Sequence, residues 1–325
     1  MKLSIAMATY NGAQYLQEQL DSFLAQTRLP DELVVCDDGS EDATIKILEL
    51  FRDNAPFNVR IFQNSDNLGH ERNFGKVIDL CEGDVIFLSD QDDVWLASKL
   101  SSIENVFNTK KWALLVINDA EIANNAMRPF GRTVLGQTRA AGIIGENCKS
   151  LTLGCATAFR SELRSLISPV PALDYAHDSW IHDFTHMLCG RYVLKQTLQL
   201  YRRHGNNASN WAFDSFARAS MQDLISLSDG QDLRPAYEKR IAALELMARR
   251  LNSLGSDAYA TLGILKPFSD VLFEINCAIN ALNQRKYMFE YGWVKRKILA
   301  VTMLLRGDYR HFIGWKSFTK DLLLR

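Results

Sequence analysis

Short apolar segments alternate with longer stretches of helical spacing along the first half of the chain, and this alternation limits the possible folds most. Residues 3–9 are expected to form a strand, because apolar side chains occupy alternate positions. A helical stretch follows, with apolar residues three to four positions apart between Tyr15 and Leu24. Further strands are predicted at residues 33–36, 59–62, 85–89, 113–117 and 192–201. The β-α-β-α order of the first half predicts an α/β protein with a mostly parallel sheet and helices on both faces.

Polar side chains follow three of the predicted strands at the point where each strand ends. These groups are Thr9-Tyr10-Asn11, Asp37-Asp38 and Asp90-Gln91-Asp92-Asp93. Ligands of parallel sheets bind beyond the carboxyl ends of the strands. The three groups are therefore expected to line one cleft.

The acidic group that follows residue 89 is a candidate cation site. Asp90, Asp92 and Asp93 place like charges close together, which is costly unless a cation lies among them. Carboxylate oxygens favour Mg²⁺ or Mn²⁺. The alternative is a solvated acidic turn before a helix, and Asp37-Asp38 has the same alternative as a turn and helix cap.

Four motifs in this order resemble glycosyltransferase family 2. They are Thr9-Tyr10-Asn11, then Asp37-Asp38-Gly39-Ser40, then Asn67-Leu68-Gly69 with Arg72-Asn73, and finally Asp90-Gln91-Asp92-Asp93. The resemblance implies the GT-A fold, with a catalytic domain over residues 1–212. Beyond it, helical spacing replaces the strand signals, so residues 213–325 are expected to form an α-helical C-terminal extension. Three segments together resemble the bacterial rhamnosyltransferase branch: residues 90–95 (DQDDVW), His177-Asp178-Ser179-Trp180 and Tyr201-Arg202-Arg203-His204.

The resemblance also implies roles for single residues. In the nucleotide-sugar site, Thr9 and Tyr10 would line the base pocket with Asn11 in the same motif, Asp38 would bind the base, and Asp90 would contact the ribose. Arg72 and Asn73 would lie close by, and Arg202 or Arg203 would pair with phosphate oxygens. For the metal, Asp92 would hold the ion that bridges the two phosphates, with Asp93 beside it and His204 as a further ligand. A plain basic loop is the alternative for Arg202 and His204.

Inverting transfer in one displacement needs a general base near the acceptor hydroxyl. Asp178 is the candidate, because it precedes a helix whose apolar stripe leaves it free to face a cleft, and the family has an acidic base at this place. A surface Asp that favours the helix N-terminus is the alternative. Asp119 and Asp183 are the competing candidates.

Two rival functions follow from other features. His182 and His186 are four residues apart on one predicted helix, as in zinc hydrolases, although Asp183 stands where a catalytic Glu would be expected. The alternative is a structural role, in which both histidines are partly buried and form local hydrogen bonds. The second rival is a non-catalytic module that binds sugar nucleotides.

Composition restricts which binding partners and which cellular compartment can be expected. The 37 basic and 38 acidic residues nearly balance, which gives no reason to expect nucleic-acid binding. Six scattered cysteines and the lack of a signal-peptide pattern favour a cytoplasmic protein.

Residues 291–325 are aromatic and basic, and predict either peripheral contact with an anionic membrane or packing on the catalytic domain. The glycine-rich residues 131–145 are expected to form a mobile loop.

Together these features predict an inverting, metal-dependent transfer of a sugar from a dTDP- or UDP-linked donor, with dTDP-L-rhamnose as the best candidate. The expected acceptor is a growing cell-surface polysaccharide, such as an O-antigen, or a lipid-linked oligosaccharide.

Overall fold

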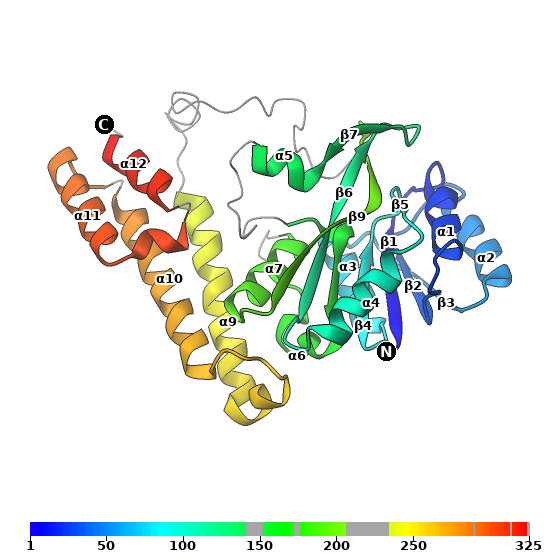
Figure 1. Ribbon diagram of the computed structural model, residues 1–325, viewed down its shortest axis with the longest axis horizontal. Coiled ribbons are helices and arrows are strands. Elements are labelled where there is room, and N and C mark those ends of the chain that lie inside the picture. The colour runs from blue at the N-terminus through cyan, green and yellow to red at the C-terminus, as the bar shows by residue number, and fades with distance from the viewer. Residues whose placement is uncertain (141–151, 172–175, 206–233, 289, 313, 324–325) are drawn as a thin grey trace. The chain divides into compact units, whose positions relative to one another are not determined.

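The computed structural model describes residues 1–140, 152–171, 176–205, 234–288, 290–312 and 314–323 (Figure 1). The chain divides into two compact units. The first contains Met1–Ala172, Ala176–Ala217 and Leu262–Leu265, and the second contains Leu173–Tyr175, Arg218–Thr261 and Lys266–Arg325. The predicted boundary between residues 212 and 213 lies outside the described residues.

The described part of the first unit is built on a nine-stranded sheet in the order β3-β2-β1-β4-β8-β6-β9-β5, with β7 paired to β6 (Figure 1). The strands are β1 (Leu3–Thr9), β2 (Glu32–Asp37), β3 (Asn58–Gln63), β4 (Val85–Ser89), β5 (Val94–Trp95), β6 (Leu115–Ala123), β7 (Pro129–Thr133), β8 (Thr157–Arg160) and β9 (Arg191–Arg202). The helices are α1 (Leu16–Leu24), α2 (Thr44–Asn54), α3 (His70–Leu80), α4 (Lys99–Thr109), α5 (Val134–Ala140), α6 (Arg164–Ile167) and α7 (His177–Met187).

Strands β3, β2, β1 and β4 run parallel, and β6 is parallel to β9. The pairs β4–β8, β6–β8, β6–β7 and β5–β9 are antiparallel, so the sheet is parallel in its first half and mixed in its second. Every residue of β2 and β4 is buried. Continuous burial is typical of central parallel strands that helices cover on both faces.

The core lies between the sheet and the helices on its faces. One face packs side chains of β1, β2 and β4 against α1, α2 and α4, with Phe23, Phe51 and Phe107 among the buried members. Helix α3 packs on β1 and β2, and α7 packs on α3. The buried residues Phe74, Val77 and Ile78 of α3 are spaced as one helical face. This arrangement holds the ends of β1, β2 and β4 side by side.

Two sequence predictions need correction. The strand predicted at residues 113–117 continues to Ala123, because its polar residues Asn118 and Asp119 are buried within the sheet. The loop predicted at residues 131–145 begins instead with β7 and α5, and residues 141–151 lie outside the described part.

The described part of the second unit consists of helices. They are α9 (Arg234–Thr261), α10 (Phe268–Met288), α11 (Trp293–Leu305), the short 3-10 helix Asp308–His311 and α12 (Trp315–Leu323). The backbone of α9 is interrupted at Gly255, whose φ of 78° only glycine adopts readily. In the core, Arg285 makes two 2.9 Å hydrogen bonds to Asp321, which also accepts one from Tyr309. No helix in the described residues is long and apolar enough to span a bilayer.

Candidate functional site

A pocket of about 370 Å³ opens at the carboxyl ends of β1, β2 and β4 and at the start of α7. It is lined by Ala8, Thr9, Tyr10, Asp38, Asn67, Gly69, His70, Asn73, Asp90, Gln91, Asp92, Leu153, Gly154, His177, Asp178 and Tyr201. The register aligns Thr9 with Asp37 and Met7 with Ser89, so the three polar groups that follow these strands meet at one edge of the sheet. The cleft predicted from the strand ends is therefore present.

Asp38 shapes one wall of the pocket. Its carboxylate accepts hydrogen bonds from the Nδ2 of Asn64 at 2.7 Å and from the backbone of Leu68 and Gly69, both at 2.8 Å. Asn73 is buried beside it and donates to the carbonyl of Cys36 at 2.8 Å. An ionised carboxylate offers about four acceptor positions. Asp38 therefore orders the loop before α3 and keeps capacity for a further hydrogen-bond donor, such as an amide of a base.

The loop after β1 is clamped to the loop after β4. The Tyr10 amide donates to Gln91 Oε1 at 2.9 Å, and Gln91 Nε2 donates to the Tyr10 carbonyl at 3.0 Å. A Cβ at Gly12 would lie 2.2 Å from Gln91 Oε1, so this position accepts only glycine while Gln91 is in place. The ring of Tyr10 is half exposed at the pocket edge, where a planar base could stack on it. Asn11 bonds Ser40 and Glu41.

The acidic group separates into residues that face the pocket and one that faces the core. Asp90 and Asp92 line the pocket, and His204 Nε2 lies 2.8 Å from Asp92 Oδ2. Asp93 is fully buried and accepts from Gln199 Nε2 and from the amide of Arg202, both at 3.1 Å. Burial and the neighbouring charge of Asp92 raise the pKa of Asp90 to about 7. Bound divalent cations relieve repulsion of this kind, and carboxylate oxygens are ligands that suit Mn²⁺ and Mg²⁺.

Two buried basic side chains, Lys99 and Arg202, lie behind this acidic group. Lys99 is fully buried, and its Nζ donates to Gln199 Oε1 and, at 2.9 Å, to the carbonyl of Cys155. Burial lowers the pKa of Lys99 to about 7, against the opposing charges of Asp93 and Asp90. Arg202 is 1% exposed, and its Nε donates to the Asp92 carbonyl at 2.6 Å. It also pairs with Glu18, 2.7 Å away.

Asp178 reaches the pocket from the first turn of α7. Its Oδ1 accepts from the amide of Ser179 at 2.6 Å, and its Oδ2 lies beside Gly154, where an added Cβ would be 3.8 Å from it. The competing candidates do not line the pocket. Asp119 Oδ1 accepts from the amides of Ala120 and Leu135, both at 2.9 Å, which gives it a structural role.

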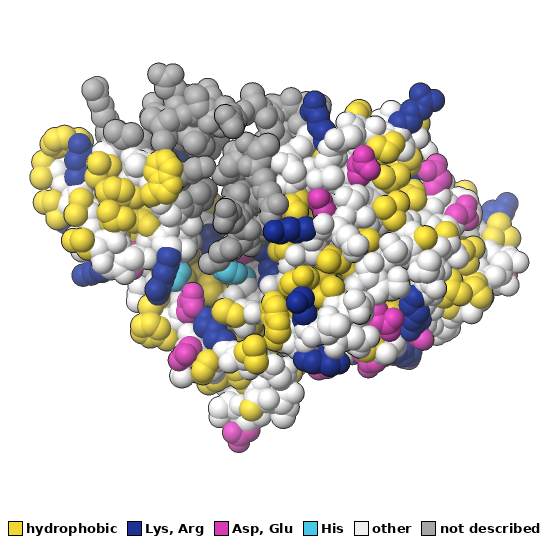
Figure 2. Space-filling model, viewed as in Figure 1, with side chains coloured by type: hydrophobic (Ala, Val, Ile, Leu, Met, Phe, Trp, Pro, Cys, Tyr) yellow, Lys and Arg dark blue, Asp and Glu magenta, His cyan; other side chains and the backbone are white. Residues whose placement is uncertain are grey.

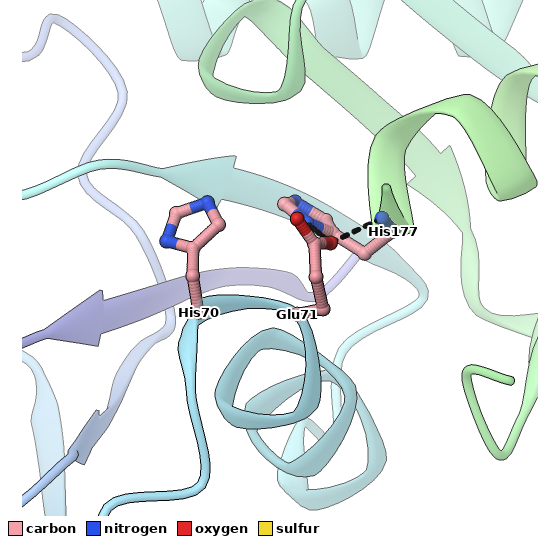
Figure 3. Close-up of side chains that lie close together, drawn as sticks. All are labelled: His70, Glu71 and His177. Carbon is pink, nitrogen blue, oxygen red and sulfur yellow. Dashed lines mark hydrogen bonds and ion pairs between the residues drawn. The ribbon is translucent and has the colours of Figure 1, made fainter. Parts of the chain in front are cut away.

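His177 begins α7 beside Asp178 and forms a compact group with His70 and Glu71 of α3 (Figure 3). Its Nδ1 lies 2.7 Å from Glu71 Oε2, and its ring stacks on Phe74 with centroids 4.2 Å apart. Burial lowers the pKa of His177, but the bond to Glu71 and the charges of Asp178 and Asp90 outweigh this effect, so the pKa is raised above its ordinary value. The imidazolium form is therefore more stable here than in an exposed histidine.

Most of the predicted site residues come together. Those that line the pocket are Thr9, Tyr10, Asp38, Asn73, Asp90, Asp92 and Asp178. Asn11, Arg72, Asp93, Arg202 and His204 are not among the lining residues, although His204 contacts Asp92. Arg72 is exposed on α3, and Arg202 lies behind Asp92. Among the residues that shape the site, Lys99, Gln199, Gln91 and Glu71 were given no role of their own from the sequence. Only Gln91, inside the acidic motif, carried a signal.

The histidines of the zinc hypothesis lie elsewhere on α7. His182 is buried with its Nε2 2.8 Å from the Thr157 hydroxyl. Burial lowers its pKa well below the ordinary value, so it is neutral. Two candidate metal groups occur in the described residues: His70, Glu71 and His177, and Asp90, Asp93 and Cys155. Neither contains His182 or His186, so the described residues offer that pair no third ligand.

Comparison with known proteins points to one family. A family model described as "Glycosyl transferase family 2" matches residues 4–164. An uncharacterized glycosyltransferase of Nostoc sp. is 29% identical over 218 residues, which cover 64% of this chain and 66% of that protein, just under two thirds of its length. The dTDP-rhamnosyl transferase RfbG of Shigella flexneri is 29% identical over 220 residues, which cover 62% of this chain and 72% of that protein.

The fold resembles that of a solved structure. The crystal structure of TarS from S. aureus in complex with UDP-GlcNAc superposes with a TM-score of 0.55 at 17% identity, covering 99% of this chain and 90% of that chain. The predicted α/β fold of the GT-A type, with a helical C-terminal region, is confirmed.

Proposed function

Residues 4–164 of this chain are a glycosyl transferase family 2 domain, and from this premise we propose that the chain moves a sugar from a nucleotide diphosphate to a hydroxyl group, with inversion. One observation carries the proposal. Asp38, Asp90, Asp92 and Asp178 come from separate stretches of sequence and line the same pocket. We also propose residues 1–212 as the catalytic domain and residues 213–325 as an extension.

The chemistry assigns a task to each wall of this pocket. Tyr10 stacks on the base, and Asp38 accepts hydrogen bonds from it, while Asp90 binds the ribose. A single displacement needs one general base near the attacking hydroxyl. Asp178 lines the pocket and accepts the proton of that hydroxyl. The hydroxyl oxygen bonds to the anomeric carbon as the bond to the diphosphate breaks, which inverts that carbon.

The activity is proposed to depend on Mg²⁺ or Mn²⁺, held by Asp92 with His204. Their 2.8 Å contact and the raised pKa of Asp90 support this set. When bound, the ion neutralises charge that develops on the leaving diphosphate. Asp93 was predicted as a metal ligand and Arg202 as a phosphate contact, but both are better suited to positioning Asp92. The Arg202 side chain donates to the Asp92 carbonyl, and the Arg202 amide donates to the Asp93 carboxylate.

The donor is proposed to be a dTDP- or UDP-sugar, with dTDP-L-rhamnose first. Support comes from the similarity to RfbG, a dTDP-rhamnosyl transferase. The TarS structure that shares this fold is a complex with UDP-GlcNAc, which keeps UDP-sugars in the test set. The acceptor is proposed to be a cell-surface glycan or a lipid-linked oligosaccharide.

A lipid-linked acceptor would suit peripheral attachment to the inner face of the membrane, and α11 offers a surface for it. Six of its apolar side chains are exposed: Trp293, Val294, Ile298, Val301, Leu304 and Leu305. At 100° per residue they fall within an arc of about 140°. Figure 2 shows hydrophobic side chains gathered over the region of α11, with Lys and Arg side chains beside them. Lys297 lies over the Trp293 ring at 4.2 Å and Lys295 over Tyr291 at 3.7 Å. Apolar side chains among cations are typical of helices that bind anionic lipid.

A transfer assay tests the proposal directly. The purified chain is incubated with each nucleotide sugar and Mn²⁺, and release of the nucleoside diphosphate is measured. The proposal expects release from at least one sugar nucleotide, to water or to an added acceptor. A chain that binds sugar nucleotides without releasing diphosphate would be a binding module instead.

A further inference from the structure

Tyr15 contacts the proposed metal ligand His204, although Tyr15 itself is not among the residues that line the pocket. The two rings are stacked, with centroids 4.7 Å apart and an angle of 29° between their planes. His204 follows β9, which ends at Arg202, so the direction of its ring depends on side-chain contacts rather than on the ladder of the sheet. Stacking on an aromatic ring restricts the rotation of an imidazole.

The Tyr15 ring is itself fixed by groups from other segments of the chain. Its hydroxyl donates to Asn125 Oδ1 at 2.6 Å, in the turn between β6 and β7. The guanidinium of Arg202 lies over the ring, with its Cζ 4.7 Å from the centroid. Arg202 also donates to the Asn125 carbonyl and, at 2.7 Å, to Glu18. Tyr15 is therefore anchored both at its hydroxyl and at its ring.

This group of contacts serves both proposed ligands of the ion. Arg202 Nε donates to the Asp92 carbonyl at 2.6 Å, and Tyr15 stacks on His204. As a result, His204 Nε2 lies 2.8 Å from Asp92 Oδ2, and both side chains are mostly buried. Two ligands that are already held side by side lose less conformational entropy when an ion binds.

We propose that Tyr15 is a positioning residue for His204, whose imidazole it holds with Nε2 beside the Asp92 carboxylate. This inference rests on the proposed function, because it requires His204 to be a metal ligand. The choice of ion shows whether Tyr15 acts through the imidazole. Imidazole nitrogen suits later transition ions such as Co²⁺, whereas Mg²⁺ prefers oxygen ligands. A misdirected His204 should therefore weaken binding with Co²⁺ more than binding with Mg²⁺.

The test is calorimetry of UDP and dTDP in an excess of Co²⁺ or of Mg²⁺, which requires no turnover. The quantity compared is the ratio of the dissociation constant in Mg²⁺ to that in Co²⁺. Tyr15→Leu removes the ring, and Asn125→Ala removes only the acceptor of its hydroxyl, for use if the first variant folds poorly. Tyr192→Leu is the matched control, since Tyr192 is a half-buried tyrosine of the same unit, outside the pocket lining. Its ring contacts Trp112 and Lys110.

Wild type is expected to bind both nucleotides more tightly in Co²⁺ than in Mg²⁺. Tyr15→Leu should lower the ratio about tenfold and Asn125→Ala about threefold, while Tyr192→Leu leaves it unchanged. His204→Ala should lower it at least as far as Tyr15→Leu. The double variant Tyr15→Leu/His204→Ala should match His204→Ala alone, because the ring acts only through the imidazole.

An unchanged ratio in Tyr15→Leu would overturn the inference, as would equal losses in the two ions or additive losses in the double variant. If Tyr15→Leu does not fold, an unchanged ratio in Asn125→Ala decides against the inference in the same way. If His204→Ala has the ratio of wild type, the inference fails while nucleotide binding stands. If wild type binds neither nucleotide in either ion, the proposed function itself fails.

Discussion

Gln91 holds the backbone of Tyr10 with two hydrogen bonds, one from the Tyr10 amide at 2.9 Å and one to its carbonyl at 3.0 Å. The two residues follow different strands, β1 and β4, so the clamp fixes the pocket wall that carries the Tyr10 ring. The glycine at position 12 makes room for it, because a Cβ there would overlap Gln91 Oε1.

Gln91→Ala is expected to weaken nucleoside diphosphate binding about tenfold, because the Tyr10 ring loses its fixed position. Gly12→Ala should have a similar effect by displacing Gln91. The double variant Gln91→Ala/Gly12→Ala should bind like Gln91→Ala alone, since the clash disappears with the side chain. Calorimetric titration with UDP and dTDP measures all three. Additive losses in the double variant would show that Gly12 acts independently of the clamp.

Asp178→Asn is expected to lower the turnover rate by about 10²–10⁴-fold with little change in donor affinity, because the amide cannot accept the proton of the hydroxyl. Asp183→Asn is the matched control on the same helix, outside the pocket lining, and should retain most activity. Rates of diphosphate release give the comparison. Loss of activity in Asp183→Asn with retention in Asp178→Asn would reverse the assignment of the base.

Asp90→Asn is expected to raise the melting temperature at pH 8 in the absence of metal. The folded pKa of Asp90, about 7, exceeds its ordinary value of 3.8, so the folded state holds more protons between these values. The free energy of unfolding therefore falls as the pH rises from about 4 to about 7, and the variant avoids this loss. The melting temperature should rise by about 2–4 °C for each kcal/mol of added stability, and the rise should shrink as the pH falls toward 4. Scanning calorimetry across pH tests this, with the exposed Asp53→Asn as control; an equal gain at pH 4 and pH 8 would rule out relief of charge repulsion.

Ile298→Glu combined with Leu305→Glu is expected to abolish binding to vesicles that contain phosphatidylglycerol, because charges enter the exposed apolar face of α11. Leu50→Glu, at an exposed leucine of the first unit on α2, should bind as wild type. Co-sedimentation with anionic vesicles and with pure phosphatidylcholine vesicles measures both effects. Wild-type protein that binds neither vesicle, or binds both equally, would contradict the attachment through basic and apolar side chains.

The parts of the fold and site that local sequence determines were predictable. The continuous apolar run at residues 85–89 predicted a central strand, and parallel strands necessarily end at one edge, which brought Asp38 and Asp90 together. The helix predicted from the apolar stripe after Asp178 is α7, which begins one residue earlier, at His177, so Asp178 lies in its first turn rather than before it.

Contacts made between distant segments were not predictable. Lys99 and Gln199 are 100 positions apart, and neither local sequence predicts that the lysine is buried under the acidic group. Glu71 and His177 meet only because α3 packs on α7. Arg202 was expected at a phosphate, but the end of β9 directs it to the Asp92 carbonyl and Glu18. Side-chain direction at a strand end depends on the neighbours that the whole sheet supplies.

The central claim is that Asp92 helps one divalent ion hold a nucleoside diphosphate in this pocket, and calorimetric titration of UDP and dTDP tests it most directly. Wild type and Asp92→Asn are each titrated with Mn²⁺ and with EDTA, and both proteins are checked for equal melting temperature. The account predicts binding by wild type that requires Mn²⁺ and is lost in Asp92→Asn. Equal binding by the two proteins, or wild-type binding that EDTA leaves unchanged, would contradict it.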